Sequence, residues 1–223
     1  MKRFILTAAA VVAMCSTAAA ADLLVTEVPA EAPAPEASSI NGYVQLMGGW
    51  TMPNTMDYSA EIPQQIDGTY DFDAGWALGA TLGIETPIDG VSVEVDILRT
   101  WADAADEGEL GAGSFISTSL MANAVYSVDL NDMFSLYGGA GLGIIALEAV
   151  GDEESFGIDA SGSGAGYQVF AGIQAAVAEN VALTFEGRYQ SSIDNVEMDA
   201  EIEGSFQQEF NRTSILAGVL FSF

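Results

Sequence analysis

Charged side chains at alternate positions in two segments are the residues best suited to chemistry. Glu94 and Asp96 stand two positions apart, and so do Glu186 and Arg188. Two carboxylates could serve a glycoside hydrolase as acid and base, charges in a pore could select ions, and acids paired with arginine could stabilise an interior. We favour the ion-pair network, in which we include Arg212, because an unpaired buried charge is costly.

The composition excludes most other chemistry. The chain has no histidine, and its one cysteine, Cys15, lies in a segment that we expect to be removed. Imidazole catalysis, thiolate catalysis and metal sites built from these residues are thereby excluded. A net charge of −27 excludes nucleic acid as a partner. We expect that the protein is not an enzyme and that it has no catalytic residue and no cofactor. The one ligand that we expect is a divalent cation, bound weakly at the acidic loops.

Two segments precede the predicted folded domain. Residues 1–20 have a cationic start, a short apolar stretch and a final run of alanines, which is typical of a secretory signal peptide. A transmembrane helix is the weaker alternative, because the apolar stretch is too short to span a bilayer. Residues 21–39 are rich in Pro, Ala and Glu and predict an extended periplasmic linker. We expect residues 40–223 to form one domain.

In this domain apolar residues alternate with small or polar ones in eight segments. A period of two predicts a strand with one apolar face, and about nine to eleven residues suffice to cross a bilayer. The predicted strands are Gly42–Thr51, Gly75–Glu85, Val91–Trp101, Ser114–Val128, Phe134–Leu147, Ala165–Val177, Val181–Gln190 and Thr213–Phe223. We therefore predict an all-β fold, namely an eight-stranded antiparallel up-and-down transmembrane β-barrel.

The connections between these segments alternate between short and long. The short ones, of five residues or fewer, are Thr86–Gly90, Asp129–Met133 and Ala178–Asn180. The long ones, of twelve residues or more, are Pro53–Asp73, Ala102–Gly113, Ala149–Gly162 and Ser191–Asn211. Short turns on one side and long loops on the other are the pattern of bacterial outer-membrane barrels.

The long loops carry 19 of the 32 acidic residues and no basic residue. A solvated, self-repelling surface is the plainer interpretation, and weak calcium binding is the sharper one. The acids of the last loop are Asp194, Glu197, Asp199, Glu201, Glu203 and Glu209. An EF-hand is not completed, since Phe210 stands where Glu is needed. Acids that alternate with Val196, Met198 and Ile202 predict instead that this loop extends the last hairpin.

Aromatic residues on the apolar faces predict two girdles at the membrane interfaces. The predicted girdle residues are Trp50, Trp76 and Trp101 at the long-loop end and Tyr126, Phe134 and Phe223 at the short-turn end. A soluble barrel of the lipocalin type would turn the apolar faces inward instead. We favour the membrane barrel, because the other faces carry mainly small residues that fit a narrow lumen and too few charges for a surface in water.

The final segment and three internal motifs resemble a known family. In the small eight-stranded outer-membrane β-barrels of Gram-negative bacteria, of OmpA and OmpX type, alternating apolar residues that end in Phe serve as the assembly signal. The residues that match this signal are Val219, Phe221 and Phe223. Tyr137–Gly143, Tyr167–Gly172 and Phe185–Tyr189 look like the porin-family surface antigens of alphaproteobacteria.

The resemblance implies an abundant envelope protein of the Gram-negative outer membrane that carries out no catalysis. Its implied partners are outer-membrane lipid and, through the last strand, the outer-membrane assembly machinery, and we expect a monomer. Two functions stay open. One is a non-enzymatic barrel that contributes to envelope integrity and exposes acidic loops. The other is a small cation-preferring pore, which the acidic mouth favours and the narrow lumen of eight strands disfavours.

Overall fold

The computed structural model describes residues 41–53, 56–61, 65–70, 73–103, 113–151, 160–200 and 205–223. The predicted signal peptide (1–20) and linker (21–39) lie outside the described residues, as do parts of the long loops. Within the described ranges, no helix is long and apolar enough to cross a membrane.

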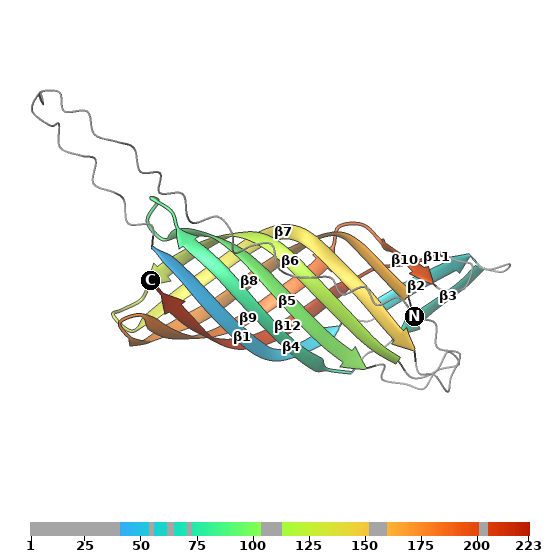
Figure 1. The fold of residues 1–223 in the computed structure, drawn as a ribbon, viewed down its shortest axis with the longest axis horizontal. Helices are drawn as coiled ribbons and strands as arrows, with labels where there is room; N and C mark the ends of the chain where they lie inside the picture. Colours follow the sequence, from blue (N-terminus) through green and yellow to red (C-terminus); the bar gives the residue numbers. More distant parts are fainter. Residues whose placement is uncertain are drawn as a thin grey trace, which may run out of the picture. The chain divides into compact units, whose positions relative to one another are not determined.

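Eight strands form the wall of a closed barrel (Figure 1). They are β1 (Gly42–Pro53), β4 (Gly75–Glu85), β5 (Val91–Asp103), β6 (Gly113–Asp129), β7 (Phe134–Gly151), β8 (Ala160–Ala178), β9 (Val181–Ser192) and β12 (Asn211–Ser222). Each strand pairs antiparallel with two neighbours, and β12 closes the ring between β9 and β1. The predicted all-β, eight-stranded antiparallel up-and-down barrel is confirmed.

The closing pair reaches the last residue of the sequence. Gly42 and Phe223 exchange two backbone hydrogen bonds, with N–O distances of 3.1 and 2.9 Å. The ring of Phe223 lies over Gly42, where an added Cβ would be 2.8 Å from a ring carbon. The first and last wall strands are therefore joined along their whole length.

Several wall strands reach further toward the long-loop side than the sequence predicted. β7 has 18 residues and β8 has 19, so the predicted loop Ala149–Gly162 is strand at both of its ends. The additional residues of β8 are mainly Ser and Gly, which carry no alternating apolar signal. These residues form a strand because the neighbouring strands β7 and β10 supply hydrogen-bond partners, which outweighs their weak intrinsic β-propensity.

Two hairpins rise from the long-loop end. They are β2 (Met56–Glu61) with β3 (Gln65–Tyr70), and β10 (Val196–Ala200) with β11 (Ser205–Gln208). The second is the predicted extension of the last hairpin. The first was missed, and the prediction of Pro53–Asp73 as loop throughout was wrong. β10 pairs with β8 and β11 pairs with β2, so the backbone hydrogen bonding of the wall continues into both hairpins.

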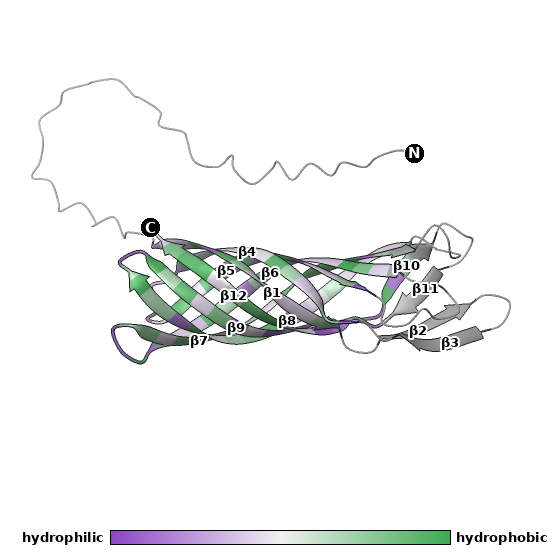
Figure 2. Ribbon diagram, turned by 90° about the horizontal axis from the view of Figure 1, so that it is seen from below, coloured by the Kyte–Doolittle hydropathy of each residue, from purple (hydrophilic) through white to green (hydrophobic). Residues whose placement is uncertain are grey.

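Hydrophobic and hydrophilic residues alternate along the wall strands (Figure 2), and the large hydrophobic ones are exposed on the outer surface. Leu78 and Leu142 are each 63% exposed on the outer surface, whereas Ser117 and Gln168 are fully buried inside. A barrel in water would show the opposite arrangement, with its apolar side chains in the interior. The structure therefore rejects the soluble barrel of the lipocalin type.

Buried apolar side chains fill part of the lumen. The larger cluster lies toward the long-loop end and consists of Phe115, Met121, Ile145, Leu147, Ala160, Val196, Met198 and Phe210. A smaller cluster consists of Met47, Ala77, Leu98 and Leu216. The side chains of the larger cluster come from β6, β7, β8, β10 and the residue before β12. We call this cluster the apolar plug.

Glycines in β7 allow close approach of the neighbouring wall strands. A Cβ added to Gly143 would collide with the carbonyl oxygen of Leu120 and lie 2.8 Å from Cα of Met121. Backbone atoms cannot give way as a flexible side chain can, so an added methyl group must displace a strand. Gly187 in β9 has no atom within 4 Å of its added Cβ and provides a matched control.

We therefore predict that Gly143→Ala lowers the free energy of unfolding by about 1–3 kcal/mol, as overpacking does. Gly187→Ala should change it by less than about 0.5 kcal/mol. Urea unfolding of both variants in lipid vesicles measures the difference. Equal stability of the two variants would contradict the close approach of β6 and β7.

Candidate functional site

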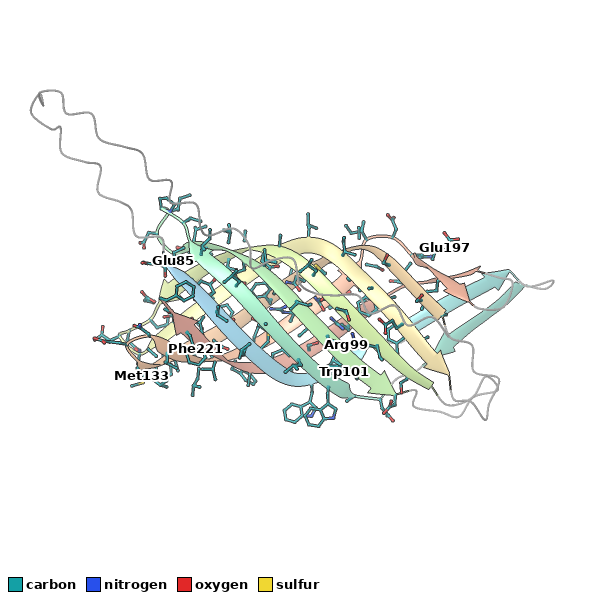
Figure 3. All side chains as sticks on the ribbon, in the orientation of Figure 1. Glu85, Arg99, Trp101, Met133, Glu197 and Phe221 are labelled. Carbon is teal, nitrogen blue, oxygen red and sulfur yellow. The ribbon has the colours of Figure 1, made fainter. Side chains whose placement is uncertain are left out.

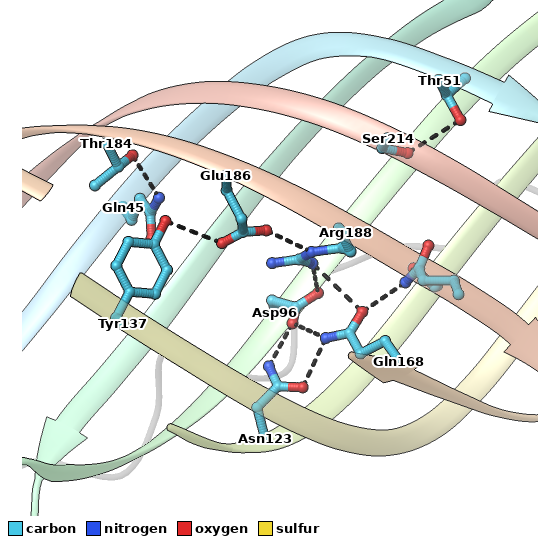
Figure 4. A network of polar contacts seen from close by, with 12 residues as sticks. Gln45, Thr51, Asp96, Asn123, Tyr137, Gln168, Thr184, Glu186, Arg188 and Ser214 are labelled. Atoms are coloured by element: carbon cyan, nitrogen blue, oxygen red, sulfur yellow. Dashed lines mark hydrogen bonds and ion pairs between the residues drawn. The ribbon is translucent and has the colours of Figure 1, made fainter. Parts of the chain in front are cut away.

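An ion pair crosses the lumen from β9 to β5. Nη1 of Arg188 lies 2.9 Å from Oδ1 of Asp96, and Nε lies 2.7 Å from Oε1 of Glu186 on the same strand (Figure 4). These three side chains are only 1–3% exposed. β5 and β9 stand four places apart in the ring of eight strands, so they lie on opposite sides of the lumen. Arg188 therefore connects two opposite walls of the barrel.

Amide side chains complete the bonding of Asp96. Its Oδ2 accepts hydrogen bonds from Asn123 at 2.5 Å and from Gln168 at 2.6 Å (Figure 4). Gln168 also accepts a hydrogen bond from Gln190, at 2.7 Å. Both oxygens of the buried carboxylate are satisfied, as a stable buried ion pair requires. We call Asp96, Asn123, Gln168, Glu186, Arg188 and Gln190 the lumen network.

Arg212 is held by neutral groups. It donates from Nε to Oε1 of Gln190 at 2.7 Å and from Nη1 to the hydroxyls of Thr100 and Ser117. Its guanidinium carbon also lies 5.3 Å from the centre of the Phe210 ring. No carboxylate in the described part of the chain forms an ion pair with Arg212. Among the described residues, Arg212 is thus connected to Asp96 indirectly, through Gln190 and then Gln168.

Glu94 lies apart from the arginines. Its Oε1 accepts a hydrogen bond of 2.5 Å from the hydroxyl of Tyr43, which also lies 3.0 Å from the hydroxyl of Ser92. No ion pair to Glu94 is present among the described residues. Glu94 is two residues nearer the short turns than Asp96 and lines a cavity at that end. Of the predicted acids, only Asp96 and Glu186 thus pair with Arg188.

The sequence analysis missed the amides and tyrosines that surround the charges. Asn123, Gln168 and Gln190 bond within the network, Tyr137 donates to Glu186 at 3.1 Å, and Tyr43 donates to Glu94. All five side chains occupy inward positions of the period-two pattern, and that parity was the available signal. It did not predict which of them would meet across the lumen.

The lumen network is suited to stabilising the barrel. The guanidinium of Arg188 and the carboxylates of Asp96 and Glu186 all bond to protein groups. Such a network excludes water and joins opposite walls, which satisfies each polar group where no solvent reaches it. No nucleophile beside a base is formed by these residues, which lack the geometry that covalent catalysis requires.

Aromatic side chains of the predicted girdles lie on the outer surface. Trp50, Trp76 and Trp101 occupy neighbouring positions on β1, β4 and β5, with ring centres of the first two 5.5 Å apart. At the other end, Tyr126 and Phe223 are 58% and 73% exposed. Phe134 is also exposed. Two bands of outward aromatic residues thus flank the aliphatic surface.

Arg99 also lies on the outer surface beside Trp101 (Figure 3). Its guanidinium carbon is 5.7 Å from the centre of the Trp101 ring, and Nη2 lies 3.7 Å from Oε2 of Glu148. The side chains of Arg99 and Glu148 are both nearly half exposed. The Arg99–Glu148 ion pair is therefore exposed, whereas the ion pairs of Arg188 in the lumen are buried.

A closed antiparallel barrel with an apolar outer surface, aromatic bands and a polar, paired interior defines a transmembrane β-barrel. The sequence matches the model of the outer membrane protein beta-barrel domain over residues 7–223, and the chain belongs to this family. It is an outer-membrane protein of a Gram-negative bacterium.

Solved structures of similar fold agree with this assignment. Neisserial surface protein A is 21% identical, with a TM-score of 0.53 over 82% of this chain and 97% of that one. OprG from Pseudomonas aeruginosa is 14% identical, with a TM-score of 0.58 over 82% of this chain and 96% of that one. At these identities the likeness concerns the fold alone. No curated protein matches the sequence significantly.

We predict that Arg188→Ala lowers the free energy of unfolding by about 3–5 kcal/mol, because it leaves two carboxylates buried without a cation. The matched control Arg99→Ala removes an exposed ion pair and should cost only about 0–1 kcal/mol. Urea unfolding of the refolded proteins, followed by tryptophan fluorescence, measures both values. A loss no larger for Arg188→Ala than for Arg99→Ala would contradict the stabilising role of the lumen network.

Proposed function

We propose that this protein is a non-enzymatic outer-membrane barrel that contributes to envelope integrity and exposes its acidic long loops at the cell surface. In this proposal residues 1–20 are a removed signal peptide, 21–39 a periplasmic linker and 40–223 the barrel. The observation that carries it is the Arg188 ion pair with its amide partners, which occupies the lumen between β5 and β9. Such a network stabilises the barrel by joining opposite walls across the lumen.

The outer surface supports a permanent association with lipid. An aliphatic band that includes Leu82, Val95 and Leu142 is exposed on the wall. Burying such side chains in hydrocarbon is favourable, at about 25 cal/mol per Å² of apolar surface. The aromatic bands would fix the depth of the barrel, since Trp and Tyr prefer the interfaces. Outer-membrane lipid is thus the first partner of the proposed function.

The last strand is the proposed contact with the outer-membrane assembly machinery. Phe221 and Phe223 are exposed, and Val219 is partly exposed on the same face of β12. Because β12 pairs with β1 only once the barrel closes, its edge is open to a partner before closure. We propose that this edge and its apolar face are recognised during insertion, and that the folded protein is a monomer.

Envelope integrity is tested by deleting the gene in the source bacterium. We predict that the deletion strain becomes more sensitive to detergent and takes up more of a dye that intact outer membranes exclude. Wild-type protein restored from a plasmid should reverse both effects. An unchanged dye uptake and detergent sensitivity would refute the proposal.

A Phe223→Ala variant tests the assembly contact. If the variant refolds in detergent and also inserts normally in cells, the assembly contact is refuted.

The alternative is a small cation-preferring pore. The acidic loops favour it, since carboxylates at a mouth concentrate cations, and a cavity of about 550 Å³ opens one end of the lumen. The lumen network and the apolar plug oppose it, because hydrogen-bonded polar side chains and packed apolar side chains lie in the lumen beyond this cavity. An ion would have to break buried hydrogen bonds to pass between Arg188 and Gln168.

We predict that the purified protein gives no steady current in planar bilayers. Arg188→Ala should leave the bilayer silent and lower only the stability of the barrel, because Asn123, Gln168 and Gln190 still occupy the lumen. A matched measurement with Arg99→Ala controls for changes at the outer surface. Steady, cation-selective conductance of the wild type would establish the pore instead.

A further inference from the structure

The lumen opens into a cavity of about 550 Å³ at the short-turn end. Its lining comes from the short-turn ends of all eight wall strands and from the first short turn, residues 86–90. In this family the short turns face the periplasm. The volume lies within the range of about 300–1,000 Å³ that small-molecule sites occupy. The cavity is therefore large enough for a ligand that enters from the periplasm.

The charges that line the cavity are all negative. Glu94 lines its inner part, whereas Glu85, Asp89 and Asp129 lie at the ends of strands or in the short turns. None of the three arginines in the described part of the chain, Arg99, Arg188 and Arg212, is part of the lining. A concave, partly enclosed surface of one sign concentrates ions of the opposite sign. A ligand of this cavity is accordingly a cation.

Glu94 is the acid that lies deepest in the cavity lining, and it forms no ion pair with the described residues. It is only 9% exposed, and the described residues offer its carboxylate one hydrogen bond, from Tyr43 to Oε1, and no cation. The neighbouring buried acids Asp96 and Glu186 both pair with Arg188. A buried carboxylate without a counter-ion is costly. The second oxygen of Glu94 is thus available to a positive group from the cavity.

The lining also indicates the kind of cation. Tyr43 and Tyr137 contribute to the cavity wall, and phenol rings and hydroxyls both bind ammonium groups well. The carboxylates are spread out, since Asp89 lies in the first short turn, Glu85 ends β4, Asp129 ends β6 and Glu94 lies inside β5. In the described ranges, no three acidic side chains lie close enough together to hold one metal ion. An elongated molecule with several ammonium groups fits this spacing better than one compact metal ion.

We propose that the cavity at the short-turn end binds an aliphatic polyamine from the periplasm. One terminal ammonium group bonds to Glu94 beneath the ring of Tyr43. The remaining ammonium groups lie between the carboxylates nearer the opening, Glu85, Asp89 and Asp129. The lumen network above Glu94 stops the molecule from passing through, so the site binds without transporting.

The test is calorimetric titration of the refolded, full mature protein in detergent with spermidine as the probe. We expect saturable binding of one spermidine, at least tenfold weaker in Glu94→Gln. The matched control is Glu179→Gln, which removes the same charge from an exposed position in the third short turn, outside the cavity lining. It should bind as the wild type does. The heat-dependent gel mobility of each variant verifies that the barrel is folded.

Several outcomes would overturn the proposal. Equal weakening by Glu94→Gln and Glu179→Gln, or loss of binding in sodium chloride of matched ionic strength, would reduce the effect to diffuse attraction by the net charge. Butylamine binding as tightly as spermidine would refute a site for several ammonium groups. Calcium binding that depends on Glu94, without spermidine binding, would make this a metal site. No heat of binding would leave the cavity as a solvent-filled opening of the barrel.

Discussion

The structure depends on one constraint, which is that the hydrocarbon interior of a membrane offers no hydrogen-bond partners. Every backbone group of the wall must therefore bond to a neighbouring strand, and the sheet has to close. β12 accomplishes this by pairing with β9 on one side and β1 on the other, up to the mutual bonds of Gly42 and Phe223. Closure then determines the rest. At the depth of the hydrocarbon the outer surface must be apolar, and polar side chains of the wall turn inward there.

Eight strands leave an interior that is just wide enough for side chains. Polar groups in so narrow a space must bond to one another, and the lumen has three consecutive regions as a result. The apolar plug lies toward the long loops, the lumen network lies in the middle, and the open cavity lies at the short turns. Arg188 compensates two of the three inner carboxylates, and Arg212 is solvated by amide and hydroxyl oxygens. Glu94 is the exception, because it has no ion pair among the described residues and borders the cavity at the short-turn end.

Much of the fold was predictable, because the alternation of side chains along a strand is a local property. The second predicted strand, Gly75–Glu85, has the bounds of β4, and the aromatic residues of the girdles lie on the outer surface. The errors arose where pairing overrides composition. Ser and Gly residues at the start of β8 and the hairpin β2–β3 are strands because neighbours bond to them. The amides of the lumen network were also missed, since nothing in a sequence marks which glutamine will face which carboxylate.

The sequence by itself determined the number of crossing segments, the two faces of each, and the chemistry that the chain lacks. These depend on residue type and on a period of two, which neighbouring residues along the chain establish. The tertiary structure confirmed that the apolar faces point outward, which the small and sparsely charged residues of the other faces had predicted. Only the tertiary structure decided that Arg188 meets Asp96 and Glu186, that Arg212 meets Gln190, and that Glu94 meets no cation among the described residues. Those partners come from strands that only the closed ring brings together.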